Sequence, residues 1–147
     1  MERIKAARPR FAALADAMYG LKIKSGPFGI NSRPAMIGAK YAATQGKPEA
    51  YNKAMLKAYW QEGRDISDLA VMRDVAQRVG LDADEFEAAL DNTEFEAEVD
   101  VDIWQARRYG LDGVPAMIFA SKYLVVGAQP YDELRLVVEQ IAARGSG

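Results

Sequence analysis

The stretch that decides the fold is residues 113–126, GVPAMIFASKYLVV. Two short apolar runs, 115–119 and 123–126, are separated by three residues, and this spacing predicts a tight β-hairpin. Proline lacks a backbone N–H, so it belongs at the start of a strand, which is where Pro115 falls. Because two strands alone form a marginal sheet, the rest of the chain must supply the core.

Before the hairpin, the chain has the pattern of a succession of helices. Apolar residues recur at helical spacing, and each run lies between a capping residue or proline and a glycine. The predicted helices start at Pro9, at Asn31 or Ser32, and at Pro48, Ser67, Leu81-Asp82 and Thr93. After the hairpin, Pro130 opens a last helix, with Asp132 and Glu133 in its first turn.

Composition bounds the class of protein. The chain has 147 residues, half of them apolar, which indicates one domain or one small domain with an appendage. A net charge of -2 argues against nucleic-acid binding. No apolar run approaches the ~20 residues that a membrane span needs, and the N-terminus has no signal-like apolar region. We therefore expect a cytoplasmic protein with no membrane partner.

The chain contains neither cysteine nor histidine. Disulfide chemistry, thiolate metal sites and Ser-His-Asp or Cys-His catalysis are therefore excluded for it. We predict no catalytic residue, no metal site and no cofactor. The alternating acidic residues of 94–102 scatter around a helix and are interpreted as a solvated face. Tyr59 and Trp60 are interpreted as core residues, and Arg64-Asp65 as a surface or capping pair.

The candidate binding residues are Gly113, Val114, Pro115 and Gln129. The dipeptide Val114-Pro115 alone favours a trans bond, because most X-Pro bonds are trans. A cis bond would expose the Val114 backbone, where an extended peptide could add as a strand. Residues 127–130 form either a plain strand-to-helix turn or one wall of the groove in which such a peptide would lie. In the second case the Gln129 amide is free to form a hydrogen bond with the peptide. Their spacing does not decide between these two readings.

Four segments, in order, resemble the DsbA-like thioredoxin family, most closely its FrnE-type disulfide oxidoreductases. They are 26–35 (GPFGINSRPA), 58–66 (AYWQEGRDI), 113–116 (GVPA) and 127–130 (GAQP). The resemblance implies a mainly α fold: the helical insertion domain of a thioredoxin fold, residues 1–110, followed by its closing β-hairpin and helix, 111–144. Residues 145–147 are predicted to be a flexible tail.

The same resemblance implies what the chain lacks. The family's Cys-x-x-Cys pair lies in a βαβ unit that would precede Met1, so the chain is expected to be a truncated, redox-inactive member. Pro115 would be the cis-proline beside the missing pair, and Val114 would contact substrate. The related 2-hydroxychromene-2-carboxylate isomerases use glutathione and a serine from the same missing unit.

Three functions remain open at this stage. The chain is a redox-inactive fragment or derivative of a disulfide oxidoreductase, a peptide- or protein-binding module, or a glutathione-linked isomerase. An exposed hairpin edge is a template for pairing with another chain. We therefore expect a homodimer formed through the hairpin.

Overall fold

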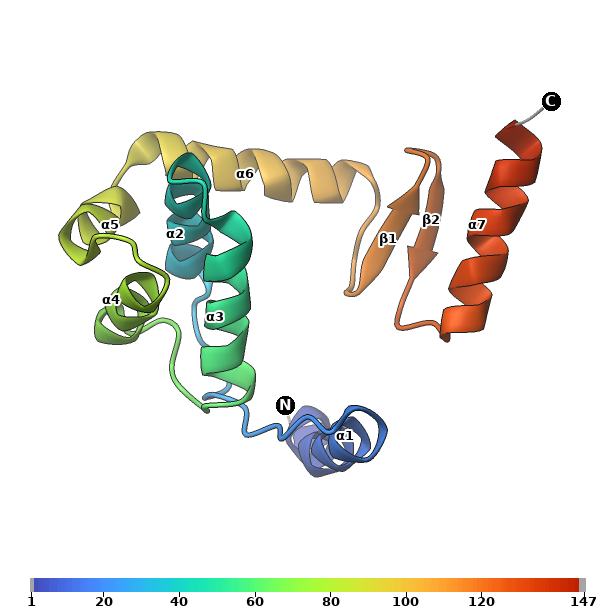
Figure 1. Ribbon diagram of the computed structural model, residues 1–147, viewed down its shortest axis with the longest axis horizontal. Coiled ribbons are helices and arrows are strands. Elements are labelled where there is room, and N and C mark those ends of the chain that lie inside the picture. Colours follow the sequence, from blue (N-terminus) through green and yellow to red (C-terminus); the bar gives the residue numbers. More distant parts are fainter. Residues whose placement is uncertain (1, 146–147) are drawn as a thin grey trace. The chain divides into compact units, whose positions relative to one another are not determined.

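The computed structural model describes residues 2–145 and divides the chain into two compact units (Figure 1). Unit 1 is Met1–Val101 and unit 2 is Asp102–Gly147. The predicted mainly α fold with a closing hairpin and helix is confirmed.

Unit 1 consists of helices. They are α1 (Glu2–Tyr19), α2 (Arg33–Thr44), α3 (Pro48–Trp60), α4 (Leu69–Arg78), α5 (Ala83–Leu90) and the first part of α6 (Thr93–Arg108). Helix α2 packs against α3 and α5, and α4 packs against the same two helices (Figure 1). Four helices therefore enclose one core.

The core of unit 1 is built around aromatic rings. Tyr51 and Phe86 are fully buried, with ring centroids 5.6 Å apart, and Tyr41 meets Phe86 edge-on at 6.1 Å. The Tyr51 hydroxyl donates to the Ala35 carbonyl oxygen at 3.2 Å, and burial raises the pKa of Tyr51. Burying one side chain of this size contributes roughly 1.5–3 kcal/mol. The three rings thus tie α2, α3 and α5 together.

Two helix caps lie one residue from their predicted positions. Asp68, not Ser67, caps α4, and its carboxylate accepts from the Ala70 N–H at 2.8 Å. Asn92, not Thr93, accepts from the backbone N–H two residues further on, also at 2.8 Å. In both places a polar neighbour with a carboxylate or amide oxygen takes the backbone donor, as Asp and Asn do at N-caps.

The first helix is longer than predicted. It begins at Glu2, so Pro9 lies inside α1 and does not open it. A proline removes one helical hydrogen bond, but the backbone on both sides of Pro9 stays helical. Residues before Pro9 are mostly charged and carry no apolar period, so the sequence pattern missed them. The helix ends at Tyr19, and Gly20 follows it with φ +64°.

Unit 2 contains the hairpin and the last helix. Strands β1 (Ala116–Phe119) and β2 (Tyr123–Val126) pair antiparallel, with Phe119 opposite Tyr123. Helix α7 (Tyr131–Gly145) follows, so Gly145 is its last residue, and the other two residues of the predicted tail lie outside the described chain. A hollow of about 220 Å³ separates β2 from α7 and is lined in part by Tyr123, Val125 and Val137.

The two-stranded sheet is apolar on both faces. Side chains alternate across a strand, and directly opposed residues share a face. The covered face, beside α7, carries Met117, Phe119, Tyr123 and Val125; the open face carries Ala116, Ile118, Leu124 and Val126. The three large residues of the open face are 37–45% exposed. A sheet that is apolar on both faces is typical of one packed on both sides.

No helix within residues 2–145 combines the length and the apolar character needed to cross a lipid bilayer.

The close packing of α2 gives a first prediction. A Cβ added at Gly38 would lie 2.6 Å from both the Phe86 ring and the Tyr51 hydroxyl oxygen, and both side chains are fully buried. We expect Gly38→Ala to lower the free energy of unfolding by about 1–3 kcal/mol, measured by urea denaturation. Ala43→Leu, on the exposed side of α2, should change it by less than about 0.5 kcal/mol. Equal losses in the two variants would contradict this packing.

Candidate functional site

The last two of the four segments meet at the open end of the hairpin. The Gly127 N–H donates to the Pro115 carbonyl oxygen at 2.8 Å, next to the strand pair of Ala116 and Val126. Gly127 has φ +85°, a conformation that glycine adopts without strain. The candidate residues before β1 and after β2 are therefore neighbours within unit 2.

The Val114-Pro115 bond is cis, as the resemblance implies and unlike the trans bond that the dipeptide alone favours. The Val114 residue is 95% exposed. Its side chain is thus open to solvent at the end of the hairpin, in the place where a bound molecule could contact it.

Gln129 and Gly113 differ from the expectation that both are available to a bound molecule or required by the shape of the site. The Gln129 amide nitrogen donates to the Val126 carbonyl oxygen at 3.0 Å, so the side chain folds back onto its own loop. One amide N–H and the amide oxygen are left for a ligand. A Cβ added at Gly113 would meet nothing within 4 Å, so the structure gives no steric reason for glycine there.

The chemistry of these four residues is limited to binding. They offer backbone N–H and carbonyl groups, one apolar side chain and one amide. None of them titrates or attacks a carbonyl or a disulfide, so the cluster supplies neither an acid–base group nor a nucleophile. Across the described residues, no three acidic side chains lie close enough together to hold a metal ion.

The first two segments meet in unit 1 and support the fold. The Gly26 N–H donates to the Tyr59 carbonyl oxygen at 2.6 Å, and the Tyr59 hydroxyl donates to the Pro27 carbonyl oxygen at 3.0 Å. A Cβ at Gly26 would lie 2.3 Å from the Arg64 carbonyl oxygen, so only glycine fits. Tyr59 is half-buried and lies outside the core cluster, and Trp60 is 37% exposed, so the interpretation of this pair as core residues is wrong.

The charged residues around these segments form surface ion pairs and turns. The Arg64 guanidinium donates to the Asp74 carboxylate and lowers the pKa of Asp74. Asp65 accepts from the Ser67 hydroxyl at 2.6 Å and from the Ser67 N–H at 2.9 Å, which lowers the pKa of Asp65. Arg64 and Asp65 thus serve as an ion-pair partner and a turn residue.

The acidic residues of α6 face basic residues of α2. Arg33 bonds Glu96 at 3.2 Å and Asp100 at 2.8 Å, and Lys40 lies 3.9 Å from Glu98. These side chains are partly solvated, and such pairs contribute little to stability. The contacts join two helices of unit 1, and the two carboxylates that converge, those of Glu96 and Asp100, are occupied by Arg33.

Sequence reasoning missed one feature of unit 1, an apolar groove of about 950 Å³ along α3. Leu56 and Trp60 line it, although Trp60 was interpreted from the sequence as a core residue. The available signal was a second apolar row on α3, formed by Leu56 and Trp60, which are four residues apart. In the structure Tyr51, Met55 and Ala58 are buried, whereas Leu56 is 59% exposed.

Comparison with known proteins fixes the family. Residues 4–139 match the DSBA-like thioredoxin domain, and the chain belongs to this family. A "probable DsbA oxidoreductase" of Streptomyces coelicolor has a similar structure, with TM-score 0.81 and 26% identity, over 95% of this chain and 60% of that protein. A 2-hydroxychromene-2-carboxylate isomerase aligns with TM-score 0.78 and 23% identity, over 99% of this chain and 68% of that one.

A curated relative covers a shorter region. The protein YwbO of Bacillus subtilis is 31% identical over 62 residues, which is 42% of this chain and 31% of YwbO. The match therefore spans about a third of that relative.

The hairpin end gives the second prediction. Replacing Gly127 by alanine places a Cβ in a left-handed backbone conformation, which costs about 1–2 kcal/mol. We expect amide hydrogen exchange in β1 and β2 to accelerate by about five- to thirtyfold, since 1.4 kcal/mol corresponds to a factor of ten. Gly113→Ala, with open space around it, is the matched control and should leave exchange unchanged. Equal acceleration in both variants would show that the loop conformation is unimportant.

Proposed function

We propose that this chain supplies the helical part and the closing hairpin and helix of a FrnE-type, DsbA-like fold and does not itself exchange thiols and disulfides. One observation carries the proposal: a family associated with disulfide chemistry is represented here by a chain without a single cysteine. Disulfide exchange begins with attack by a thiolate, and no other side chain supplies that reaction.

The candidate site supports the same proposal. Gly113, Val114, Pro115 and Gln129 can hold a polypeptide by hydrogen bonds and apolar contact, but they cannot accept or deliver electrons. The isomerase likeness rests on 23% identity and concerns the fold alone. Since none of the four residues bears a hydroxyl or thiol, we propose no glutathione-linked isomerase activity.

Insulin reduction tests the redox proposal. The chain is added to insulin and dithiothreitol, and precipitation of the insulin B chain is followed by turbidity. We expect the same rate as with dithiothreitol alone, while an equal amount of thioredoxin accelerates it. Acceleration by this chain, in a preparation whose measured mass rules out contaminants, would overturn the proposal.

A second role, as a binding module, is favoured by the hairpin. Within the described chain β1 pairs with β2 alone, so its outer edge has unpaired backbone groups. The open face beside it carries no charged side chain. We propose that a second copy of the chain covers this edge and face. Two β1 strands can pair antiparallel about a two-fold axis, and the two open faces then meet without like charges.

Light scattering after size exclusion tests the dimer. At micromolar concentration we expect twice the 16.2 kDa of one chain. Ile118→Lys places a charge on the open face and should give the single-chain mass, because an unpaired buried charge is costly. Val138→Lys, at a 49% exposed position on α7, is the control and should remain dimeric.

The wild-type mass decides between the binding candidates. A clean monomer would overturn the homodimer. If that monomer bound an extended peptide, with amide protection gained in β1, the binding role would remain and its partner would be a different polypeptide.

A further inference from the structure

Helix α3 forms one wall of the apolar groove in unit 1, and the segment from α1 to Ile23 forms the other. Phe11, Leu21 and Ile23 line one side, and Leu56 and Trp60 line the other. Disulfide chemistry and the hairpin do not account for this surface, which lies entirely within unit 1.

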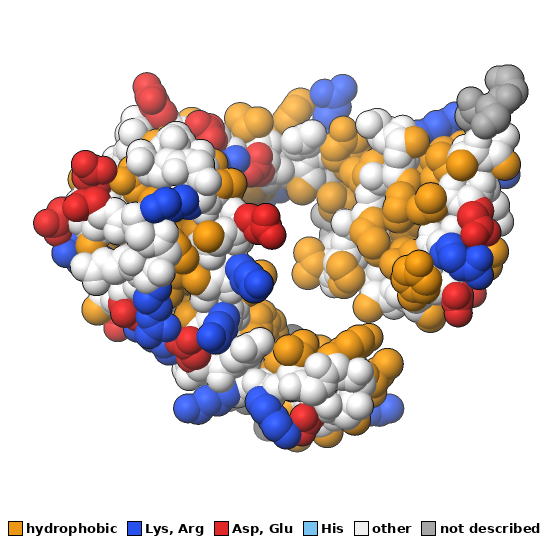
Figure 2. All heavy atoms as spheres, viewed as in Figure 1, with side chains coloured by type: hydrophobic (Ala, Val, Ile, Leu, Met, Phe, Trp, Pro, Cys, Tyr) orange, Lys and Arg blue, Asp and Glu red, His pale blue; other side chains and the backbone are white. Residues whose placement is uncertain are grey.

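The groove leaves large apolar side chains open to water. Leu56 is 59% exposed, Phe11 50% and Leu21 42%. Figure 2 shows apolar side chains on the surface of the region around α1. Contiguous exposed apolar surface with a polar rim marks an interaction site more often than scattered apolar residues do.

Specific contacts hold the two walls together. The Phe11 and Trp60 rings meet edge-on, with centroids 5.8 Å apart. The Lys24 N–H donates to the Trp60 carbonyl oxygen at 2.8 Å, and an Arg8 guanidinium nitrogen lies 3.3 Å from the Tyr59 hydroxyl. The groove is therefore built by hydrogen bonds and ring packing at the C-terminal end of α3.

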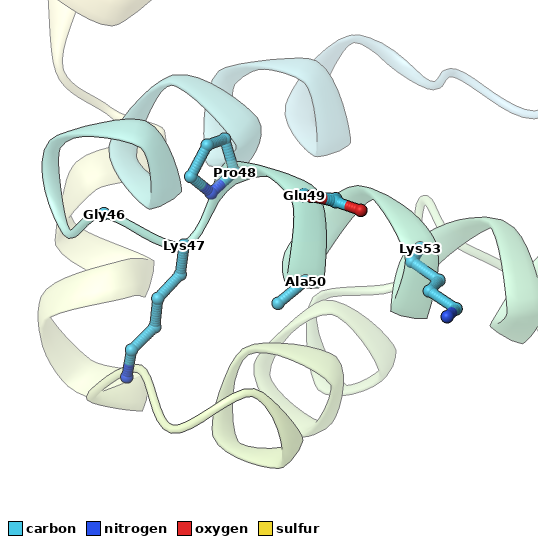
Figure 3. A pocket seen from close by; sticks show the side chains of 6 residues that line it. All are labelled: Gly46, Lys47, Pro48, Glu49, Ala50 and Lys53. Carbon is cyan, nitrogen blue, oxygen red and sulfur yellow. The ribbon is translucent and has the colours of Figure 1, made fainter.

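The groove has the length of a short helix. Its lining on α3 runs from Pro48 to Gln61, which is roughly 20 Å at 1.5 Å per residue. A second hollow, of about 510 Å³, continues it at the start of α3 and shares Pro48, Glu49 and Lys53 (Figure 3). An amphipathic helix of three to four turns would fit along this length.

The charges at the rim indicate which helix would fit. Lys53 and Lys57 are four residues apart, so they are neighbours on α3. Neither forms an ion pair with a described residue, unlike Lys22, which lies 2.5 Å from Asp16. Figure 3 shows Lys53 directed away from α3, whereas Lys47 reaches the turn before α5 and donates to the Gly80 carbonyl oxygen at 2.6 Å.

We propose that this groove binds an acidic amphipathic helix of a partner protein. The apolar face of that helix would cover Phe11, Leu56 and Trp60. Two carboxylates, one helical turn apart, would pair with Lys53 and Lys57. Glu49 lines the groove near the start of α3 and disfavours a third carboxylate there.

Tryptophan fluorescence tests this proposal directly. The chain has two tryptophans, so Trp104→Phe leaves Trp60, in the groove, as the sole reporter. The probe is a synthetic 14-residue helical peptide with leucines on one face and two glutamates four residues apart beside that face. We expect a saturable change in Trp60 emission, and no saturation with the peptide whose glutamates are replaced by lysine.

Variants that reverse the charges of Lys53 and Lys57 give a second test. Lys53→Glu with Lys57→Glu should weaken binding of the acidic peptide at least tenfold and favour the lysine peptide, because the rim charge is reversed. Lys122→Glu, on the hairpin turn of unit 2, makes the same kind of change elsewhere and should leave binding unchanged. Circular dichroism checks each fold, and Lys53→Gln with Lys57→Gln replaces the double variant if it unfolds.

Four outcomes would overturn the proposal. They are failure of the acidic peptide to saturate, equal binding of the lysine peptide, insensitivity to both lysine substitutions, and a Trp60 emission that changes on dilution without peptide. The last would assign the groove to a second copy. Binding of anionic phosphatidylglycerol vesicles in place of the peptide would assign it to a lipid surface.

Discussion

The structure of unit 1 depends on how closely α2 approaches the two rings of Tyr51 and Phe86. At Gly38 no side chain separates the α2 backbone from these rings, and a single added carbon would collide with both. The contact lets Tyr51 reach the Ala35 carbonyl oxygen, so its buried hydroxyl keeps a hydrogen-bond partner. The helices that carry the first two family segments are positioned by this one close approach.

Unit 2 depends on a different constraint: its sheet has two apolar faces, and each must be covered. One helix can cover one face, and α7 does so beside Tyr123 and Val125. The other face carries Ile118, Leu124 and Val126, whose exposure to water is unfavourable. Val114 is 95% exposed and lies two residues before the start of β1 in the chain, so the candidate site belongs to the same unit as this uncovered face.

Sequence patterns predicted the elements well because those patterns are local. Pro48 opens α3, α5 begins directly after Leu81-Asp82, and the two apolar runs pair as a hairpin, as expected from helix-start signals and strand spacing. The predicted N-cap was wrong where two neighbouring residues can each cap a helix, as Ser67 and Asp68 can at the start of α4. Distant contacts were not predictable: periodicity on α3 does not reveal that Leu56 faces outward across from Phe11.

In the candidate site, too, some features follow from nearby residues in the sequence and others do not. The adjacency of Pro115 and Gly127 follows from the register of the hairpin, and the sequence predicted the hairpin but not its register. The inward fold of the Gln129 amide onto Val126 is a choice among side-chain rotamers, which no spacing rule determines. The residues Gly26 and Tyr59 belong to the same family pattern, yet their contacts explain packing rather than recognition. A shared motif therefore identifies the fold here, while the chemistry must be argued from the side chains that the chain possesses.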